Sequence, residues 1–113
     1  MNLLPCEVKA GKAFFAGTPV ETGNAGQSAG RATRIELGVR PEFVSLAERG
    51  IAAEIVKVSD AGRYRIVDTR AAGHSVKLLV PEGDAIPQGR VNLAFDPAHT
   101  KVYEDGWMAG ARP

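Results

Sequence analysis

The sequence predicts a small all-β domain made of short strands, and three observations support this. The chain has 113 residues, the length of one compact domain. Thirteen glycines and seven prolines divide it into short segments, and both residue types favour turns. Several segments alternate apolar and polar residues with the period of two that a half-buried strand requires, and no long stretch keeps the helical period.

The charge balance excludes one broad class of function. Fourteen basic and thirteen acidic residues give a net charge of +1. A protein that binds nucleic acid by neutralising phosphates needs a strongly basic face. We therefore expect no nucleic-acid partner.

Three features bear on location in the cell. No apolar run reaches the roughly eighteen residues that a membrane-spanning helix needs. Residues 1–7 form too short an apolar stretch, too soon charged, for a signal peptide. The single cysteine, Cys6, has no second cysteine for an internal disulfide. These features predict a cytoplasmic protein.

The first part of the chain predicts short strands separated by turns. Residues 4–10 have strand composition and lead through a Gly-Lys turn into the apolar run 13–16. A brief strand around Val20 interrupts a glycine-rich stretch, and we expect residues 22–30 to form an exposed loop. At residues 35–39 apolar side chains alternate and share one face of a strand.

Residues 41–47 predict one short helical turn. Pro41 suits the first helical position, and Glu42 suits the positive end of a helix. The apolar residues Phe43, Leu46 and Ala47 fall on one side at helical spacing. The segment has room for two turns at most before the next glycine.

The segment 51–58 predicts a strand with an irregularity. Its apolar face includes Ile55 and then switches to Val56 and Val58. Such a switch indicates a β-bulge, or burial on both faces. The following Ser-Asp-Ala-Gly sequence at 59–62 has the composition of a turn.

Residues 63–70 predict the next strand. We expect Tyr64 and Ile66 to face inward, and Arg63 and Arg65 to face solvent. Two more alternating strands follow, and their inward residues are Val76, Leu78 and Val80, then Val91, Leu93 and Phe95.

The end of the chain predicts a cap and a last strand. Asp96 offers a carboxylate to early backbone N–H groups, and Pro97 stands where a helix needs no N–H. A brief strand at 101–103, a turn at 104–106 and Trp107 follow. Five or more short strands, one short helical turn and no long helix favour a small closed or nearly closed barrel. At this size the usual solution is the five-stranded oligonucleotide/oligosaccharide-binding (OB) fold.

Two nucleotide-binding motifs and any metal-binding spacing are missing. The sequence contains no phosphate-binding Gly-x-x-x-x-Gly-Lys-Ser/Thr loop and no Gly-x-Gly-x-x-Gly. His74, His99 and Cys6 are the soft ligand candidates, and no pair of them has the spacing of a metal site. We therefore expect no catalytic and no metal-binding residues in this chain.

Two groups of charged residues have alternative interpretations. Residues 40–42, Arg-Pro-Glu, form either an ion-pairing cluster or the start of the helical turn, and capping rules favour the turn. Arg63, Arg65 and Arg70 fall near one hairpin, where they form either an anion site or a solvated strand face. The solvated face is the simpler interpretation.

Three stretches resemble landmarks of one family, in the same order. They are Met-Asn-Leu-Leu at 1–4, Leu-Gly-Val-Arg-Pro-Glu at 37–42, and the stretch 95–106, which runs from Phe-Asp-Pro to Asp-Gly. They resemble the C-terminal regulatory region of bacterial ABC-transporter ATPases of the sugar-importer type. The accessory domain of that region is called TOBE or molybdate-binding-protein-like (MOP-like). The resemblance covers essentially the whole chain and is weakest at 11–30.

The resemblance implies a single TOBE/OB-like regulatory domain over residues 1–113, in a fragment whose nucleotide-binding domain lies upstream. ATP and Mg²⁺ would bind in that domain, so this chain would carry no cofactor and no enzyme activity. Its implied partners are a second copy of the subunit, the transporter's membrane subunits, and a regulatory protein or small effector. Its implied location is cytoplasmic, peripheral to the inner membrane.

The residues that match the family signature are taken as mainly architectural: Arg40, Pro41, Glu42, Phe95, Asp96 and Pro97. One departure is the turn at 59–62, where relatives more often carry an acidic residue, an apolar residue and glycine. For a dimer contact, candidate apolar residues are Phe14, Phe15 and Trp107. The alternative function is a small-anion or effector-binding module of the MOP-like type, for which Ser59, Lys77 and Thr100 are available.

Overall fold

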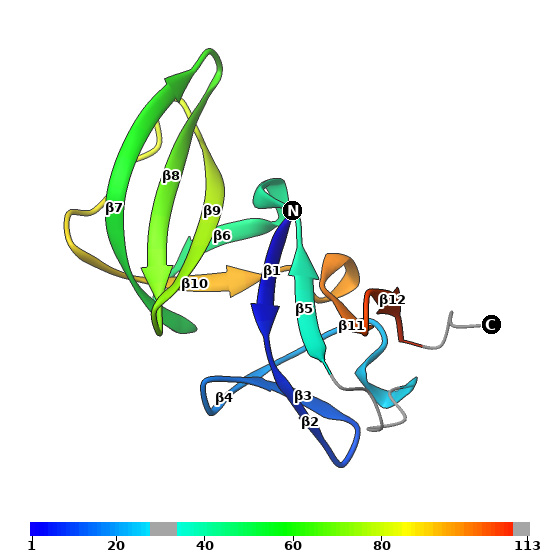
Figure 1. The fold of residues 1–113 in the computed structure, drawn as a ribbon. Coiled ribbons are helices and arrows are strands. Elements are labelled where there is room, and N and C mark those ends of the chain that lie inside the picture. Colours follow the sequence, from blue (N-terminus) through cyan, green and yellow to red (C-terminus); the bar gives the residue numbers. More distant parts are fainter. Residues whose placement is uncertain (28–33, 110–113) are drawn as a thin grey trace. The chain divides into compact units, whose positions relative to one another are not determined.

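Strands dominate the computed structural model, which describes residues 1–27 and 34–109 (Figure 1). Three antiparallel sheets and three single 3₁₀ turns make up its regular structure, and the described residues contain no α-helix. The predicted all-β class is therefore confirmed. Within this part of the chain, no helix has the length and apolar character needed to cross a membrane.

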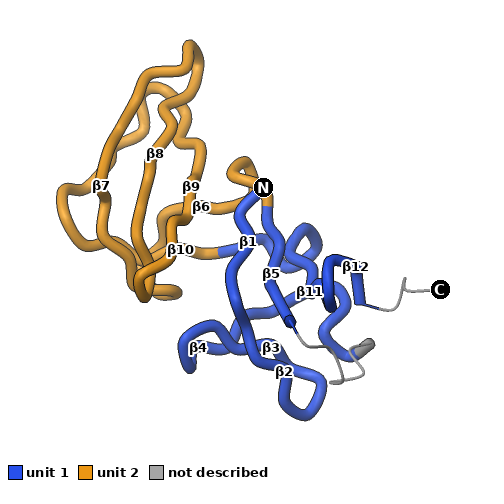
Figure 2. Tube along the Cα trace, in the orientation of Figure 1, with its two compact units in different colours: residues 1–39, 95–113 blue, residues 40–94 orange. Residues whose placement is uncertain are grey.

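The chain divides into two compact units (Figure 2). Residues 1–39 and 95–113 form unit 1, and residues 40–94 form unit 2. Unit 1 is thus assembled from both ends of the sequence, whereas unit 2 is continuous. The chain leaves unit 1 after Val39 and returns to it at Phe95.

Unit 1 contains two sheets. The four-stranded sheet has the order β1 (Asn2–Pro5), β5 (Ile35–Val39), β11 (Lys101–Glu104) and β12 (Trp107–Met108). The three-stranded sheet has the order β2 (Glu7–Lys9), β3 (Lys12–Phe15) and β4 (Thr18–Val20). The largest fully buried side chains of this unit are Leu4, Phe15, Leu37, Val39 and Val102. Burial of these apolar surfaces is the main force that holds the two sheets in place.

Unit 2 contains one five-stranded sheet. Its order is β6 (Val44–Ala47), β10 (Arg90–Phe95), β7 (Ile51–Ala61), β8 (Tyr64–Ala71) and β9 (His74–Pro81). The predicted inward residues Val76, Leu78, Val80, Val91, Leu93 and Phe95 are all buried. The two edge strands, β6 and β9, lie beside each other, although no ladder of hydrogen bonds joins them. The sheet is therefore curved, so that its two edge strands come near each other.

The predicted irregularity in strand 51–58 is confirmed as a β-bulge. The pairing of β7 with β8 shifts register between Ile55 and Lys57. Val56, the extra residue, has 65% of its surface exposed. Because one residue is left out of the alternation, Ile55 and Val58 lie on the same face, opposite Thr69 and Val67, although Val58 is 42% exposed.

The predicted orientation of strand 63–70 is wrong. Tyr64 is 47% exposed, and the buried residues of β8 are Val67, Thr69 and Ala71. Thr69 pairs with Val76, and Val67 pairs with Leu78. Residues directly opposite on neighbouring strands share a face, so the strictly alternating strand β9 decides which face of β8 is buried.

The predicted helical turn at 41–47 is shorter than expected. A 3₁₀ turn, η2 (Pro41–Phe43), is followed directly by strand β6. Val44 has extended backbone angles, φ −107° and ψ 130°. Its β-branched side chain favours a strand, and β6 gains hydrogen-bonded partners in β10, which a second helical turn would forgo.

Gly50 provides a test of the packing in unit 2. Its φ is +149°, and a Cβ added there would overlap the carbonyl oxygen of Leu93. Backbone does not yield as a flexible side chain does, so we expect Gly50→Ala to lower the free energy of unfolding by more than about 2 kcal/mol. Urea unfolding measures this change.

Gly62→Ala is the matched control. Gly62 also has a positive φ, +76°, but no atom lies within 4 Å of its added Cβ. Gly62→Ala should lower the free energy of unfolding by only about 1 kcal/mol, the cost of the backbone strain. Equal losses in the two variants would show that the overlap at Gly50 is relieved.

Candidate functional site

The six signature residues lie where the chain passes between its two units. Arg40, Pro41 and Glu42 are the first residues of unit 2. The other three, beginning with Phe95, are the first residues after the return to unit 1. The stretches that carry the family resemblance therefore include both crossings.

The two crossings have nearly the same local structure. Each has a proline at the first position of a 3₁₀ turn, η2 (Pro41–Phe43) or η3 (Pro97–His99). The carbonyl groups of Arg40 and Asp96 each accept an N–H three residues on, both at 3.0 Å. The N–H of the residue after each turn donates to the carbonyl of the proline. Proline fixes φ and needs no donor partner, which suits it to this position.

The first crossing carries no ion-pairing cluster. No salt bridge involves Arg40 or Glu42 within the described residues. The backbone bonds of η2 account for these residues, as the capping interpretation predicts.

The second crossing is reinforced by side chains. The carboxylate of Asp96 accepts the N–H of Ala98 at 3.1 Å and lies 3.0 Å from Nδ1 of His99. The hydroxyl of Thr100 donates to the carbonyl of Asp96 at 2.8 Å. The hydrogen bond with His99 lowers the pKa of Asp96 below its ordinary value of 3.8, and the N–H of Ala98 contributes to this shift. The predicted cap at Asp96-Pro97 is confirmed.

A buried asparagine anchors the segment after β4, which the sequence predicted to be an exposed loop. Asn24 is only 7% exposed. Its amide donates to the carbonyl groups of Val102 at 3.1 Å and Ala109 at 3.2 Å, and it accepts the N–H of Val102 at 2.7 Å. The prediction is therefore wrong at Asn24 and at Ala25, which is also buried; its residues 28–30 lie outside the described part of the chain.

Two further bonds fix the same segment. The N–H of Ala25 donates to the hydroxyl of Thr22 at 2.9 Å, and the N–H of Gly23 donates to the carbonyl of Thr100 at 3.0 Å. The ammonium of Lys101 lies so close to Gly23 that a Cβ there would overlap it. These contacts hold residues 22–25 in one conformation.

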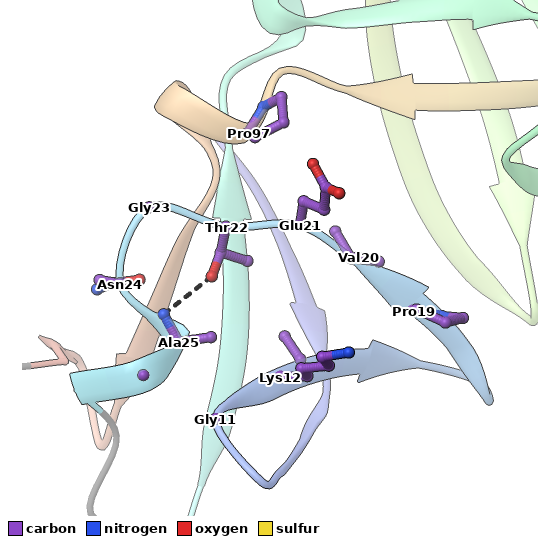
Figure 3. Close-up of a pocket in the computed structure, with 12 residues that line it drawn as sticks. Gly11, Lys12, Pro19, Val20, Glu21, Thr22, Gly23, Asn24, Ala25 and Pro97 are labelled. Carbon is purple, nitrogen blue, oxygen red and sulfur yellow. Dashed lines mark hydrogen bonds between the residues drawn. The ribbon is translucent and has the colours of Figure 1, made fainter.

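This anchored segment forms one wall of a cavity of about 420 Å³ in unit 1 (Figure 3). Strands β3 and β4 form two other walls, through Lys12, Ala13, Pro19 and Val20. Glu21 and Pro97 also line it. The volume lies in the range of small-molecule sites, about 300–1,000 Å³.

The arginines near the hairpin of unit 2 do not form one site. Arg65 lies on the buried face of β8, because it shares that face with Val67, and its guanidinium donates to the carbonyl of Asp84. The prediction that Arg65 faces solvent is therefore wrong. Arg70 lies on the opposite face, where its guanidinium donates to the carbonyl of Gly73 at 3.3 Å.

The residues considered for metal or anion binding have other contacts. No group of three metal-ligating side chains occurs in the described ranges. Cys6 is half-buried. Its burial is the main cause, and the nearby carboxylate of Glu36 a smaller one, of a rise in the pKa of its thiol to about 11. Thr100 is fully buried in unit 1, and Lys77, in unit 2, lies 3.7 Å from Asp68.

The predicted apolar residues separate into core and surface. Phe15 is buried and Phe14 half-buried, whereas Trp107 is 48% exposed. Other exposed apolar side chains, those of Leu3 and Met108, lie on one face of the four-stranded sheet, where the ring of Tyr103 covers Gly38.

Neither the family models nor the curated proteins compared with this chain give a match.

Asn24→Ala should destabilise unit 1. The substitution leaves the N–H of Val102 without its 2.7 Å partner and removes both bonds donated by the amide. Since each buried polar group left unpaired costs about 1–3 kcal/mol, we expect a loss of about 2–3 kcal/mol in the free energy of unfolding. Urea unfolding gives the value. Asn92→Ala removes a single exposed bond to Glu48 and should cost less than about 1 kcal/mol; a similar loss in both would contradict the anchoring role.

The Asp96 carboxyl should titrate below 3.8, its ordinary pKa. A lowered folded-state pKa means that the stabilisation is present above the unfolded value and is lost as the pH falls through the folded value. A carboxyl-detected NMR titration follows the group directly. His99→Ala removes the largest cause, so the midpoint should rise toward 3.8. His74→Ala should leave it unchanged, and a midpoint insensitive to His99 would disprove the assignment.

Proposed function

We propose that this chain is a non-catalytic regulatory and dimerisation domain of the ATP-binding subunit of a bacterial importer, of the TOBE type. The observation that carries the proposal is the position of the motifs that resemble that family. Arg40-Pro41-Glu42 and Phe95-Asp96-Pro97 fall at the two crossings between the units. Proteins that share this fold would retain the residues that shape these two crossings.

The shape of unit 2 supports an OB-like barrel. Five short antiparallel strands form its sheet, and the edge strands β6 and β9 lie side by side. A sheet that curls this far needs a bulge or another local irregularity, and β7 has one at Val56. We therefore propose a nearly closed five-stranded barrel.

In this proposal, ATP is hydrolysed in another domain of the same subunit. The sequence contains no phosphate-binding loop, and ATP with Mg²⁺ would bind in a nucleotide-binding domain of the same subunit. This domain would instead contact a second subunit, and through the assembled transporter the membrane subunits. A cytoplasmic position at the inner membrane follows from that role.

An exposed face with several apolar side chains in unit 1 supports contact with a second copy. Leu3, Tyr103 and Met108 share this face of the four-stranded sheet with the charged residues Glu36 and Lys101. Trp107 lies on the edge strand. Apolar side chains gathered on one exposed face are typical of an interaction site. In the proposed dimer this face is buried against its counterpart.

Sedimentation equilibrium of the chain tests the proposed contact. We expect concentration-dependent dimerisation that Leu3→Glu weakens by about tenfold or more, because a carboxylate would be buried without a partner. Val56→Glu changes another exposed apolar residue, in unit 2, and should leave the association unchanged. A monomer at every concentration, together with an upstream gene sequence that encodes no phosphate-binding loop, would refute the proposal.

A further inference from the structure

We propose that the cavity of unit 1 binds a small zwitterion, a molecule that carries one ammonium and one carboxylate group. The cavity is lined by residues 11–13, 19–26 and 97. It lies within unit 1 and involves neither the apolar face nor a second subunit, so the inference stands apart from the proposed dimerisation.

The charges in the cavity are the first argument. Lys12 and Glu21 are the charged side chains among the lining residues. Lys12 belongs to β3, and Glu21 follows directly after β4. Figure 3 shows them on different walls, with Val20 between. Neither side chain forms a salt bridge or a hydrogen bond with any residue in the described ranges.

Apolar side chains form part of the cavity lining. Ala13 and Val20 are opposite each other on neighbouring strands, and both are buried. Pro19 and Pro97 add two ring surfaces at the sides. A ligand in this cavity therefore meets two proline rings together with one cationic and one anionic side chain. The carbon skeleton of the zwitterion would lie against those rings.

Opposite unpaired charges select the class of ligand. A ligand that covers a charged side chain removes it from water, and this is unfavourable unless an opposite charge replaces the water. A simple anion satisfies Lys12 but leaves Glu21 uncompensated, and a simple cation does the reverse. A zwitterion satisfies both, with its carboxylate on the Lys12 ammonium and its ammonium on the Glu21 carboxylate.

The cavity wall is already ordered without a ligand. Residues 22–25 are fixed by the bonds of Asn24 and Thr22 and by the N–H of Gly23. The turn at Gly11 lies next to Gly26, so that a Cβ on Gly11 would be in ordinary van der Waals contact with the Cα of Gly26, at 3.7 Å. A wall held in place beforehand lowers the entropy cost of binding.

The test is an NMR titration of the chain with glycine, β-alanine, 4-aminobutyrate and 6-aminohexanoate, which differ in charge separation. Butyrate and butylamine serve as singly charged controls. We expect at least one of the four zwitterions to shift the amide signals of Val20, Gly23 and Ala25 saturably, at concentrations where the controls do not. The preferred member of the series then reports the distance between the two charges.

Two variants test which charged side chain binds which end of the zwitterion. Glu21→Gln should weaken zwitterion binding by about tenfold and remove the preference over butyrate, and Lys12→Met should remove the preference over butylamine. Lys9→Met and Glu7→Gln are matched controls, because this exposed ion pair lies on the neighbouring strand β2 and does not line the cavity. Both should bind as the unmodified chain does.

Two outcomes would overturn the proposal. One is the absence of saturable shifts with all four zwitterions, and the other is equal binding of butyrate or butylamine. The apolar-face variant Leu3→Glu keeps the cavity intact, so its binding should be normal. The experiments therefore distinguish a failure of dimerisation from a failure of zwitterion binding.

Discussion

One buried amide holds unit 1 together. The side chain of Asn24 both donates to and accepts from the backbone of Val102, as the peptide group of a neighbouring strand would. It also bonds to Ala109, so β11, the end of the described chain and the segment after β4 meet at one side chain. A buried polar group with every bond satisfied specifies a single arrangement, because any displacement leaves several groups unpaired. The cavity wall depends on this arrangement.

The two crossings impose a second constraint. Each is a single 3₁₀ turn that begins at a proline and is followed within a residue or two by a strand, β6 or β11. Proline removes conformational freedom from the unfolded chain, and backbone bonds close each turn. The crossings are therefore ordered segments of the chain.

The sequence predicted most of the fold where patterns are local. Alternation at Val91, Leu93 and Phe95 and the bulge after Ile55 needed only neighbouring residues. Tyr64 was misplaced because the face of β8 is decided by its pairing with β9. Asn24 gave no signal in the sequence, since its partners lie 78 and 85 positions away. The cavity was missed for another reason: no motif marks Lys12 and Glu21, and only the pairing of β3 with β4 and the folding of residues 22–26 place them around one space.

The discontinuous make-up of unit 1 has a consequence for the order of folding. Strand β5 pairs with β11, and all of unit 2 lies between them in the sequence. Closing so long a loop is slow while the intervening chain is disordered. Unit 2, whose β7, β8 and β9 pair through successive hairpins, contains local contacts that form early. During synthesis on the ribosome, the four-stranded sheet and the Asn24 anchor cannot form until residues 101–109 have emerged, so unit 1 is completed after unit 2.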